Sequence, residues 1–313
     1  MTADFFADAA PTSDMDKVER DRWGRPLIKP VDGGKPKAFQ RVTTFIKALD
    51  DTAGLALWQQ RMVLKGIAAR PDLLLAAQAH SDDDKELGRI CKDALEAAAA
   101  SSKATIGTAI HRITERLDAG EKFAIPDTVK ADVEAYRRAT EKIEWLHREK
   151  MVVHDDWQLA GTPDGIGRFN GEIIVADLKT GSLWPSSCAT QMGVYAHSKL
   201  YDINTGVRGD HSASTDRALV IHLAAGSGVC NLVWVDVKAG YEACSVARQV
   251  HVWRKRKDLA TPYVAPADTD ALTALILTAP DEAELGLLWK QYKSRWTDTY
   301  TELAKQRKVE LAS

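Results

Sequence analysis

The 313-residue sequence has few cysteines and no long apolar run. Its cysteines, Cys91, Cys188, Cys230 and Cys244, form no CxxC pair, so neither a zinc knuckle nor a disulfide framework is indicated. No apolar segment reaches membrane-spanning length, and the acidic start MTADFFADAA lacks the positive charge of a signal peptide. We therefore expect reduced thiols and a cytoplasmic protein without a membrane partner.

The sequence also lacks a marked excess of charge of either sign. Its formal net charge is -2 and its pI about 6.5, so affinity for a polyanion would have to come from a local basic surface. It contains no GxxxxGK[ST] loop, so a nucleotide-driven motor is not indicated. With 45% hydrophobic and 27% charged residues, the chain is long enough for one large domain or for one core with helical additions.

The most informative segment is LAGTPDGIGRFNGEIIVADLKTG at residues 159–181. Residues 173–176 are all apolar, which is typical of a strand covered on both faces. Because side chains alternate along a strand, Val175, Asp177 and Lys179 share one face, so an acid and a base lie where core is expected. A buried ion pair with no other role is often neutral or destabilising for the fold. The presence of one here therefore indicates that a third group, such as a metal ion, binds to it.

Asp164 precedes this strand in a predicted hairpin whose turn lies near residues 169–171. The return strand would bring Asp164 beside Asp177, so two carboxylates and one ammonium would meet at one end of a sheet. Simpler interpretations exist, because TPDG at residues 162–165 is also an ordinary turn sequence and Asp177 with Lys179 could be a solvated strand end. The three residues together favour a site.

Pro163 and Asp164, followed by Asp177, Leu178 and Lys179, resemble the PD-(D/E)XK signature of the restriction-endonuclease-like nuclease superfamily. Two further segments resemble the additional motifs of its RecB-like branch, which includes CRISPR-associated exonucleases: GTAIH at residues 107–111 and QMGVY at residues 191–195. Motifs in this order are more specific together than any one alone. The chain resembles a phage-type RecB-like exonuclease.

The resemblance implies a metal-dependent DNA exonuclease of phage recombination or DNA processing, acting in the host cytoplasm if phage-encoded. Its cofactor would be Mg²⁺ or Mn²⁺, and its partners DNA with free ends and a single-strand annealing recombinase. A structure-specific endonuclease and a catalytically silent DNA-binding module of the same fold are the alternatives. Because the cysteines are scattered, unlike those of many CRISPR-associated relatives, we expect no iron-sulfur cluster.

The same resemblance assigns roles to residues. Asp164, Asp177 and the Leu178 carbonyl supply the oxygen ligands that Mg²⁺ prefers. A lone histidine on a helix is usually structural, and it is the GTAIH match that makes His111 a further ligand. Lys179 would orient or deprotonate the attacking water. One helical turn apart, Gln191 and Tyr195 could be a core-packing pair, and the resemblance favours a pair that positions the phosphate or the water.

The expected fold is α/β, with a restriction-endonuclease-like central mixed sheet of about five strands flanked by helices and with helical additions at both ends. Strands beside the hairpin are predicted at residues 151–159, 217–224 and 229–236. Helices are predicted at residues 72–79, 82–101, 105–119, 128–150, 187–201, 240–257, 268–277 and 282–308. The expected divisions are a mobile tail (1–37), a helical region carrying GTAIH (38–120), the nuclease core (121–260) and a C-terminal helical extension (261–313).

Two groups of residues are candidates for the DNA backbone. Arg41, Thr43 and Thr44 begin an N-terminal helical segment that packs near the DNA entry in the resembling nucleases. Arg254, Lys255, Arg256 and Lys257 end a predicted helix, where they also suit the helix dipole without any partner.

Two apolar stripes at helical spacing are interpreted as core packing. The N-terminal stripe consists of Val42, Phe45, Ile46, Leu49, Leu55, Leu57, Trp58, Met62 and Leu64. The C-terminal stripe consists of Leu285, Leu288, Trp289, Tyr292, Trp296 and Leu303.

Overall fold

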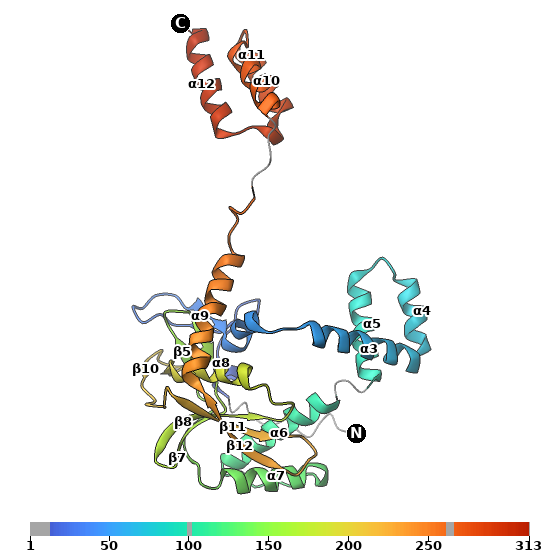
Figure 1. The fold of residues 1–313 in the computed structure, drawn as a ribbon, viewed down its shortest axis with the longest axis vertical. Coiled ribbons are helices and arrows are strands. Elements are labelled where there is room, and N and C mark those ends of the chain that lie inside the picture. Colours follow the sequence, from blue (N-terminus) through green and yellow to red (C-terminus); the bar gives the residue numbers. More distant parts are fainter. Residues whose placement is uncertain (1–12, 99–101, 261–265, 313) are drawn as a thin grey trace. The chain divides into compact units, whose positions relative to one another are not determined.

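The computed structural model describes residues 13–98, 102–260 and 266–312 (Figure 1). The chain divides into two compact units, Met1–Arg254 and Lys255–Ser313, and each is described by itself. The boundary lies close to the expected start of the C-terminal extension at residue 261.

A five-stranded mixed sheet forms the centre of the described part of the first unit, in the order β12-β11-β8-β7-β4. In this sheet β8 and β11 run parallel, and the other neighbouring strands run antiparallel. The strands are β4 Glu144–Arg148, β7 Gly165–Phe169, β8 Glu172–Lys179, β11 Arg217–Leu223 and β12 Cys230–Asp236.

The predicted hairpin is present in β7 and β8. Its loop is Asn170 and Gly171, which have φ values of 50° and 84°, and two positive φ angles suit the right-handed twist of a two-residue hairpin. The register sets Gly165 opposite Ala176. Asp164 therefore lies just before the paired residues, beside the end of β8.

Both faces of β8 are covered, as its apolar run predicts. Val175 packs in a cluster with residues of α8 (Pro185–Ala196) and α9 (Val237–Arg254). Ile174, Ala176 and Leu178 pack on the opposite face in a cluster with residues of α6 (Ser102–Asp118) and α7 (Asp127–Thr140) (Figure 1). The strand that carries Asp177 and Lys179 is consequently held from both sides.

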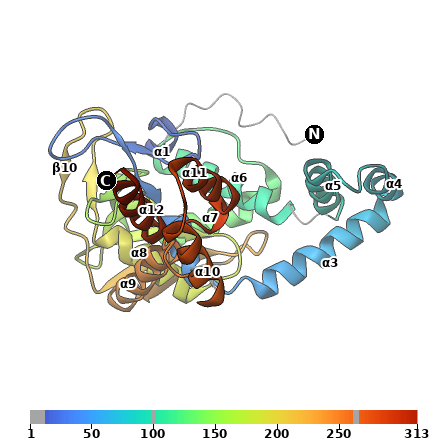
Figure 2. The same ribbon diagram turned by 90° about the horizontal axis from the view of Figure 1, so that it is seen from above.

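Helices α8 and α9 lie side by side (Figure 2) because glycines allow a close approach. A Cβ atom on Gly193 would lie 2.7 Å from the Tyr241 nitrogen, and one on Gly240 would lie 2.0 Å from the Ala189 carbonyl oxygen. This contact fixes α8, the helix that contains Gln191 and Tyr195, against the rest of the core.

A second five-stranded mixed sheet, with the order β10-β9-β5-β6-β3, was not expected. Residues 151–159 were predicted to open the central sheet, but β5 and β6 belong to this second sheet, and the predicted helix at 187–201 ends before β9. These strands are only two or three residues long, too short for an alternating pattern to identify. They are β3 Gln40–Arg41, β5 Val152–His154, β6 Leu159–Gly161, β9 Lys199–Tyr201 and β10 Arg208–Gly209.

The predicted helix at residues 128–150 is also partly wrong, because α7 ends at Thr140 and β4 follows. Along β4, Glu144 and Leu146 are exposed while Trp145 and His147 are half-buried, an edge-strand alternation too short to distinguish from a helical period. The chain then crosses from the central sheet to the second sheet at residues 149–151 and returns at residues 162–164. These two crossings border the site described below.

Residues 13–37, expected to be a mobile tail, contain α1 (Asp14–Lys17), β1 (Leu27–Ile28) and the start of β2 (Lys37–Ala38). Buried Ile28 packs with Val153 of the second sheet and with Met151, which directly precedes β5. The backbone N–H of Asp14 donates to the Glu149 carbonyl at 3.0 Å, and the Asp14 carboxylate accepts from the Met151 N–H at 3.2 Å. Residues 1–12 of the predicted tail lie outside the described residues.

The N-terminal apolar stripe has two different environments. Val42, Phe45 and Ile46 of α2 (Val42–Phe45) and the following 3₁₀ turn (Ile46–Leu49) are buried in the core, as predicted. Leu55, Leu57, Trp58 and Leu64 were also predicted to pack, but they are exposed on α3 (Ala53–Ala69). Helix α3 packs with α4 (Pro71–Ala79) and α5 (Asp84–Ala97) around a small separate cluster of Leu73, Ile90 and Ala94.

The second unit has its own core, formed by α10 (Pro266–Leu277), α11 (Glu282–Gln291) and α12 (Asp298–Ala312). Leu285 and Leu288 are buried there as predicted, whereas Trp289 is exposed. The single helix expected at residues 282–308 is broken after Gln291, and Thr297 accepts the first backbone bonds of α12. No helix in the described part of the chain is both long and apolar enough to cross a bilayer.

Candidate active site

An open cavity of about 480 Å³ lies at the C-terminal end of β8, where α6, α8 and the two crossings between sheets come together. Every residue predicted to be catalytic or to bind metal lines this cavity: His111, Asp164, Asp177, Leu178, Lys179, Gln191 and Tyr195. The motifs that are far apart in the sequence therefore meet at one place.

Asp164 is held against the end of β8 by its carboxylate. Its Oδ2 accepts a hydrogen bond from the Leu178 backbone N–H at 2.6 Å, and His111 Nδ1 lies 3.7 Å from the same oxygen. In an extended strand the N–H and C=O of one residue point to the same edge, so the Leu178 carbonyl also faces the side of Asp164. His111 reaches this position from α6, which covers the adjoining face of the sheet.

Asp177 forms an ion pair with Lys179, and α8 completes the network around them. Lys179 Nζ donates to Gln191 Oε1 at 3.0 Å, while Gln191 Nε2 lies 3.4 Å from Asp177 Oδ1 and 3.2 Å from the Tyr195 hydroxyl oxygen. The amide oxygen of Gln191 thus faces the cation and its nitrogen faces the anion. The contacts fix the lysine side chain as well as the carboxylate.

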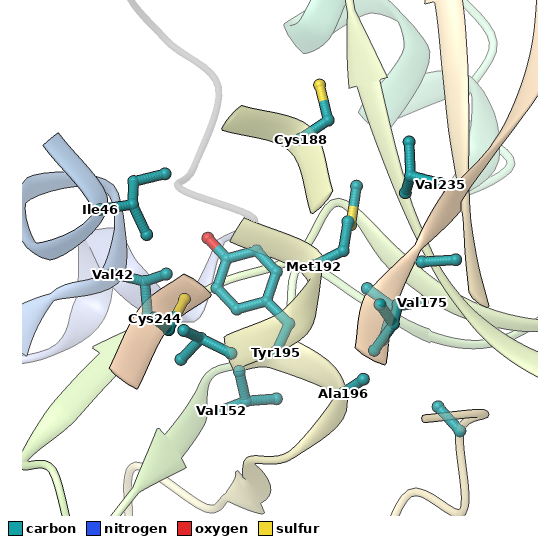
Figure 3. Packing of buried hydrophobic residues seen from close by; sticks show 14 of the residues in the cluster. Val42, Ile46, Val152, Val175, Cys188, Met192, Tyr195, Ala196, Val235 and Cys244 are labelled. Carbon is teal, nitrogen blue, oxygen red and sulfur yellow. The ribbon is translucent and has the colours of Figure 1, made fainter. Parts of the chain in front are cut away.

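Tyr195 belongs to both the core and the site. Its ring packs among Val42, Val152 and Met192 (Figure 3), and only 2% of the residue is exposed. Its hydroxyl reaches Gln191. Core packing, one of the two interpretations that the sequence left open, is therefore present at the ring, and positioning of the phosphate or the water stays a prediction.

Burial and neighbouring charges shift the pKa values of Asp177 and Lys179. Burial, followed by the nearby Asp164 carboxylate, raises the pKa of Asp177 to about 6 in spite of the ion pair with Lys179. For Lys179, burial opposes the charged form, but Asp177 outweighs it and raises the pKa of the ammonium. Lys179 is consequently protonated at neutral pH.

Two glycines, one in the GTAIH motif and one at the end of β6, are required by close packing. A Cβ atom on Gly107, the first residue of GTAIH, would lie 2.5 Å from Thr180 Oγ1, directly after Lys179. A Cβ atom on Gly161 would lie 2.6 Å from Tyr195 Cε1. These contacts set α6 and the second crossing close to β8 and α8.

The sequence did not identify Glu149, which also lines the cavity. Burial, followed by the charges of Asp164 and Glu115, raises the pKa of Glu149 to about 9. Glu149 was predicted to lie in a helix, where an acidic residue between basic neighbours is typical of the surface. No local signal in the sequence could therefore have identified it as a site residue. Glu115, one turn after His111, lines the same cavity.

No protein-family model matches the sequence, and no curated protein is significantly similar to it. The family that the motifs suggest therefore remains a hypothesis, supported by the residues and their arrangement.

The site fits Mg²⁺ or Mn²⁺ through its oxygen donors. Among the described residues, no three His, Cys, Asp or Glu side chains converge as a ready-made metal site. Mg²⁺ does not require one, because it keeps several waters and is commonly held by one or two carboxylates. Asp164, Asp177 and the Leu178 carbonyl provide such a set.

The candidate DNA contacts are only partly at the site. Arg41 and Thr43, at the junction of β3 and α2, line the cavity, whereas Thr44 is exposed and is not among its lining residues. Arg254 is the last residue of α9 and also does not line it. In the second unit, which begins with Lys255, Arg256 pairs with Asp258 at 2.7 Å. Lys257 is exposed.

The cysteines occupy different environments. Cys188 and Cys244 are buried, Cys230 is partly buried and Cys91 is exposed on α5. Cys244 Sγ donates to the Thr190 carbonyl at 3.4 Å, and burial raises the pKa of this thiol to about 12. Buried thiols of this kind pack as small apolar groups.

Proposed function

We propose that this chain is a metal-dependent deoxyribonuclease with a restriction-endonuclease-like fold that hydrolyses phosphodiester bonds from DNA ends. The observation that carries the proposal is the meeting of Asp164, Asp177 and Lys179 in one cavity, together with His111, Gln191 and Tyr195. Two carboxylates can hold a metal ion for phosphodiester hydrolysis, and a lysine beside them can offset the charge that develops on the phosphate.

Asp164, Asp177 and the Leu178 carbonyl would hold Mg²⁺ or Mn²⁺, and His111 would be a further ligand. When bound, one or two such ions supply a nucleophilic water and neutralise charge on the phosphate. The hydrogen bond from the Leu178 backbone N–H to the Asp164 carboxylate would hold the two carboxylates in fixed relative positions before the substrate binds.

Lys179 would orient the attacking water and offset the negative charge that develops on the phosphate. Its raised pKa supports this role over that of a general base. Gln191 accepts from Lys179 and contacts the Tyr195 hydroxyl, so these two residues would position the lysine. If Asp177 held a divalent ion, its ion pair with Lys179 would be weakened, and the ammonium would be available to the substrate phosphate.

Arg41 and Thr43 would bind a phosphate at the edge of the cavity. Action from free ends, a recombinase partner and a role in phage recombination in the host cytoplasm are proposed from the resemblance of the motifs.

The test is digestion of linear DNA labelled at either end, compared with closed circular DNA, in Mg²⁺, Mn²⁺ or EDTA. We expect metal-dependent release of end label and little cutting of circles. Asp177→Asn should be inactive, and Glu144→Gln, which changes an exposed acid on β4, should be fully active. Equal rates on circles would indicate the structure-specific endonuclease, and DNA binding without cleavage would indicate the silent binding module.

A further inference from the structure

Glu149 is fixed at the first crossing between the two sheets. Its backbone N–H donates to the Asp164 carbonyl at 3.4 Å, and its carbonyl accepts from the Asp14 N–H at 3.0 Å. Its side chain lines the cavity beside His111 and Asp164. The two crossings thus bring Glu149 and Asp164 together although they lie on different connections.

The backbone of Glu149 adopts a conformation that suits glycine better than glutamate. Its φ of 49° lies in the left-handed region, where a side chain crowds the following carbonyl. Strain of this kind persists where the surrounding structure requires it and is concentrated at functional sites. Glycine or asparagine would suit this backbone conformation better than glutamate. The presence of glutamate therefore indicates that its carboxyl group is needed at this position.

The carboxyl group of Glu149 is buried without a full set of partners. The residue is 8% exposed; Ser13 forms a hydrogen bond with its carboxyl group, but Oε1 has no hydrogen-bond partner among the described residues. The neighbouring cation, Arg148, is engaged with Asp118 at 2.5 Å and makes no hydrogen bond to Glu149. An ordinary structural ion pair therefore does not account for this carboxyl group, which would lose its proton on binding a cation.

We propose that Glu149 is a further metal-site residue, binding a divalent cation between its own carboxylate and Asp164. The inference rests on the proposed nuclease function and adds a ligand that lies outside the sequence motifs. The ion's remaining positions would be filled by water and substrate phosphate, as is usual for Mg²⁺. A cation there would also relieve the charge that Asp164 and Glu115 impose on Glu149.

The test is the affinity of the full-length protein for Mn²⁺ without DNA, measured by titration calorimetry and by the paramagnetic resonance of free Mn²⁺. We expect Glu149→Gln to weaken Mn²⁺ binding by about tenfold or more. The matched control is Glu144→Gln on the preceding strand, which should bind as the parent does. Unchanged Mn²⁺ affinity in Glu149→Gln would overturn the proposal.

Two further variants keep the result interpretable. Asp177→Asn must also weaken Mn²⁺ binding, and if it does not, the metal site of the proposed function fails rather than Glu149 alone. Glu149→Asn removes the carboxylate but suits the left-handed backbone, so it should fold at least as well as the parent in EDTA and still lose Mn²⁺ affinity. Parental Mn²⁺ affinity in that folded variant would also refute the role.

Discussion

Asp164 and Asp177 are the residues on which the proposed chemistry depends most directly. We predict that Asp164→Asn or Asp177→Asn lowers the cleavage rate by roughly 100-fold or more, because each removes an oxygen ligand from the metal. DNA affinity should change little, because the proposed phosphate contacts, such as Arg41, would supply most of it. Single-turnover cleavage and fluorescence anisotropy measure the two effects separately. Near-parental turnover of either variant in Mg²⁺ would remove that residue from the site.

Lys179 should behave differently from the carboxylates. Lys179→Ala is expected to slow cleavage by roughly 100-fold or more, because the ammonium acts on the water and the phosphate. It should not weaken Mn²⁺ binding, because Lys179 holds the Asp177 carboxylate in an ion pair that competes with a bound cation. A variant with unchanged turnover, or with greatly weakened Mn²⁺ binding, would contradict this assignment.

The raised carboxyl pKa values make a prediction for the metal-free protein. The pKa of Asp177 rises from 3.8 to about 6 and that of Glu149 from 4.5 to about 9, so the folded state holds these protons more tightly than the unfolded state does. Their stabilising contribution is complete below pH 4. It is lost as the pH rises through about 6 for Asp177 and about 9 for Glu149.

Urea denaturation in EDTA at pH 5 and at pH 9 measures this effect. Relative to the parent, Glu149→Gln should gain about 1 to 3 kcal/mol of unfolding free energy between the two pH values, because its amide does not ionise. Glu144→Gln should show no such gain, because Glu144 is exposed. A pH-independent difference between parent and Glu149→Gln would show that this carboxyl is not perturbed.

At the scale of elements, packing between β6 and α8 positions the polar network. We predict that Gly161→Ala destabilises the fold by about 1 to 3 kcal/mol, because the new methyl would overlap the Tyr195 ring, which is enclosed in the core. Turnover should also fall, since the Tyr195 hydroxyl contacts Gln191. Gly209→Ala is the control, because its Cβ would make an ordinary 3.7 Å contact with Leu200. Equal stability of the two variants would contradict the prediction.

The elements also explain which parts of the structure the sequence could predict. The β7–β8 hairpin was predictable because an apolar run and an Asn170–Gly171 turn are local signals. Strand β4 and the short strands of the second sheet were not, because their pairing depends on distant residues. Asp177 and Lys179 could be identified from their spacing along one strand, which is also a local signal. The place of Glu149 in the site could not, because it results from the crossing between the sheets, from a positive φ and from burial, none of which a local sequence pattern indicates.

At the scale of the whole molecule, the proposed chemistry belongs to one unit. Every residue that lines the site cavity lies between Ser13 and Tyr195, and the second unit, Lys255–Ser313, has a separate apolar core. The two cores share no residue in their apolar clusters, so removal of one need not unfold the other.

We predict that a chain ending after residue 257 remains folded and cleaves short oligonucleotides within a few-fold of the parental rate. Circular dichroism checks the fold, and a short end-labelled duplex reports cleavage without the need for an extended DNA surface. If the second unit binds DNA, its loss should weaken binding to long DNA and flatten the salt dependence of that binding, because fewer counterions are released. Loss of short-substrate cleavage by a folded truncated chain would mean that the second unit contributes to catalysis itself.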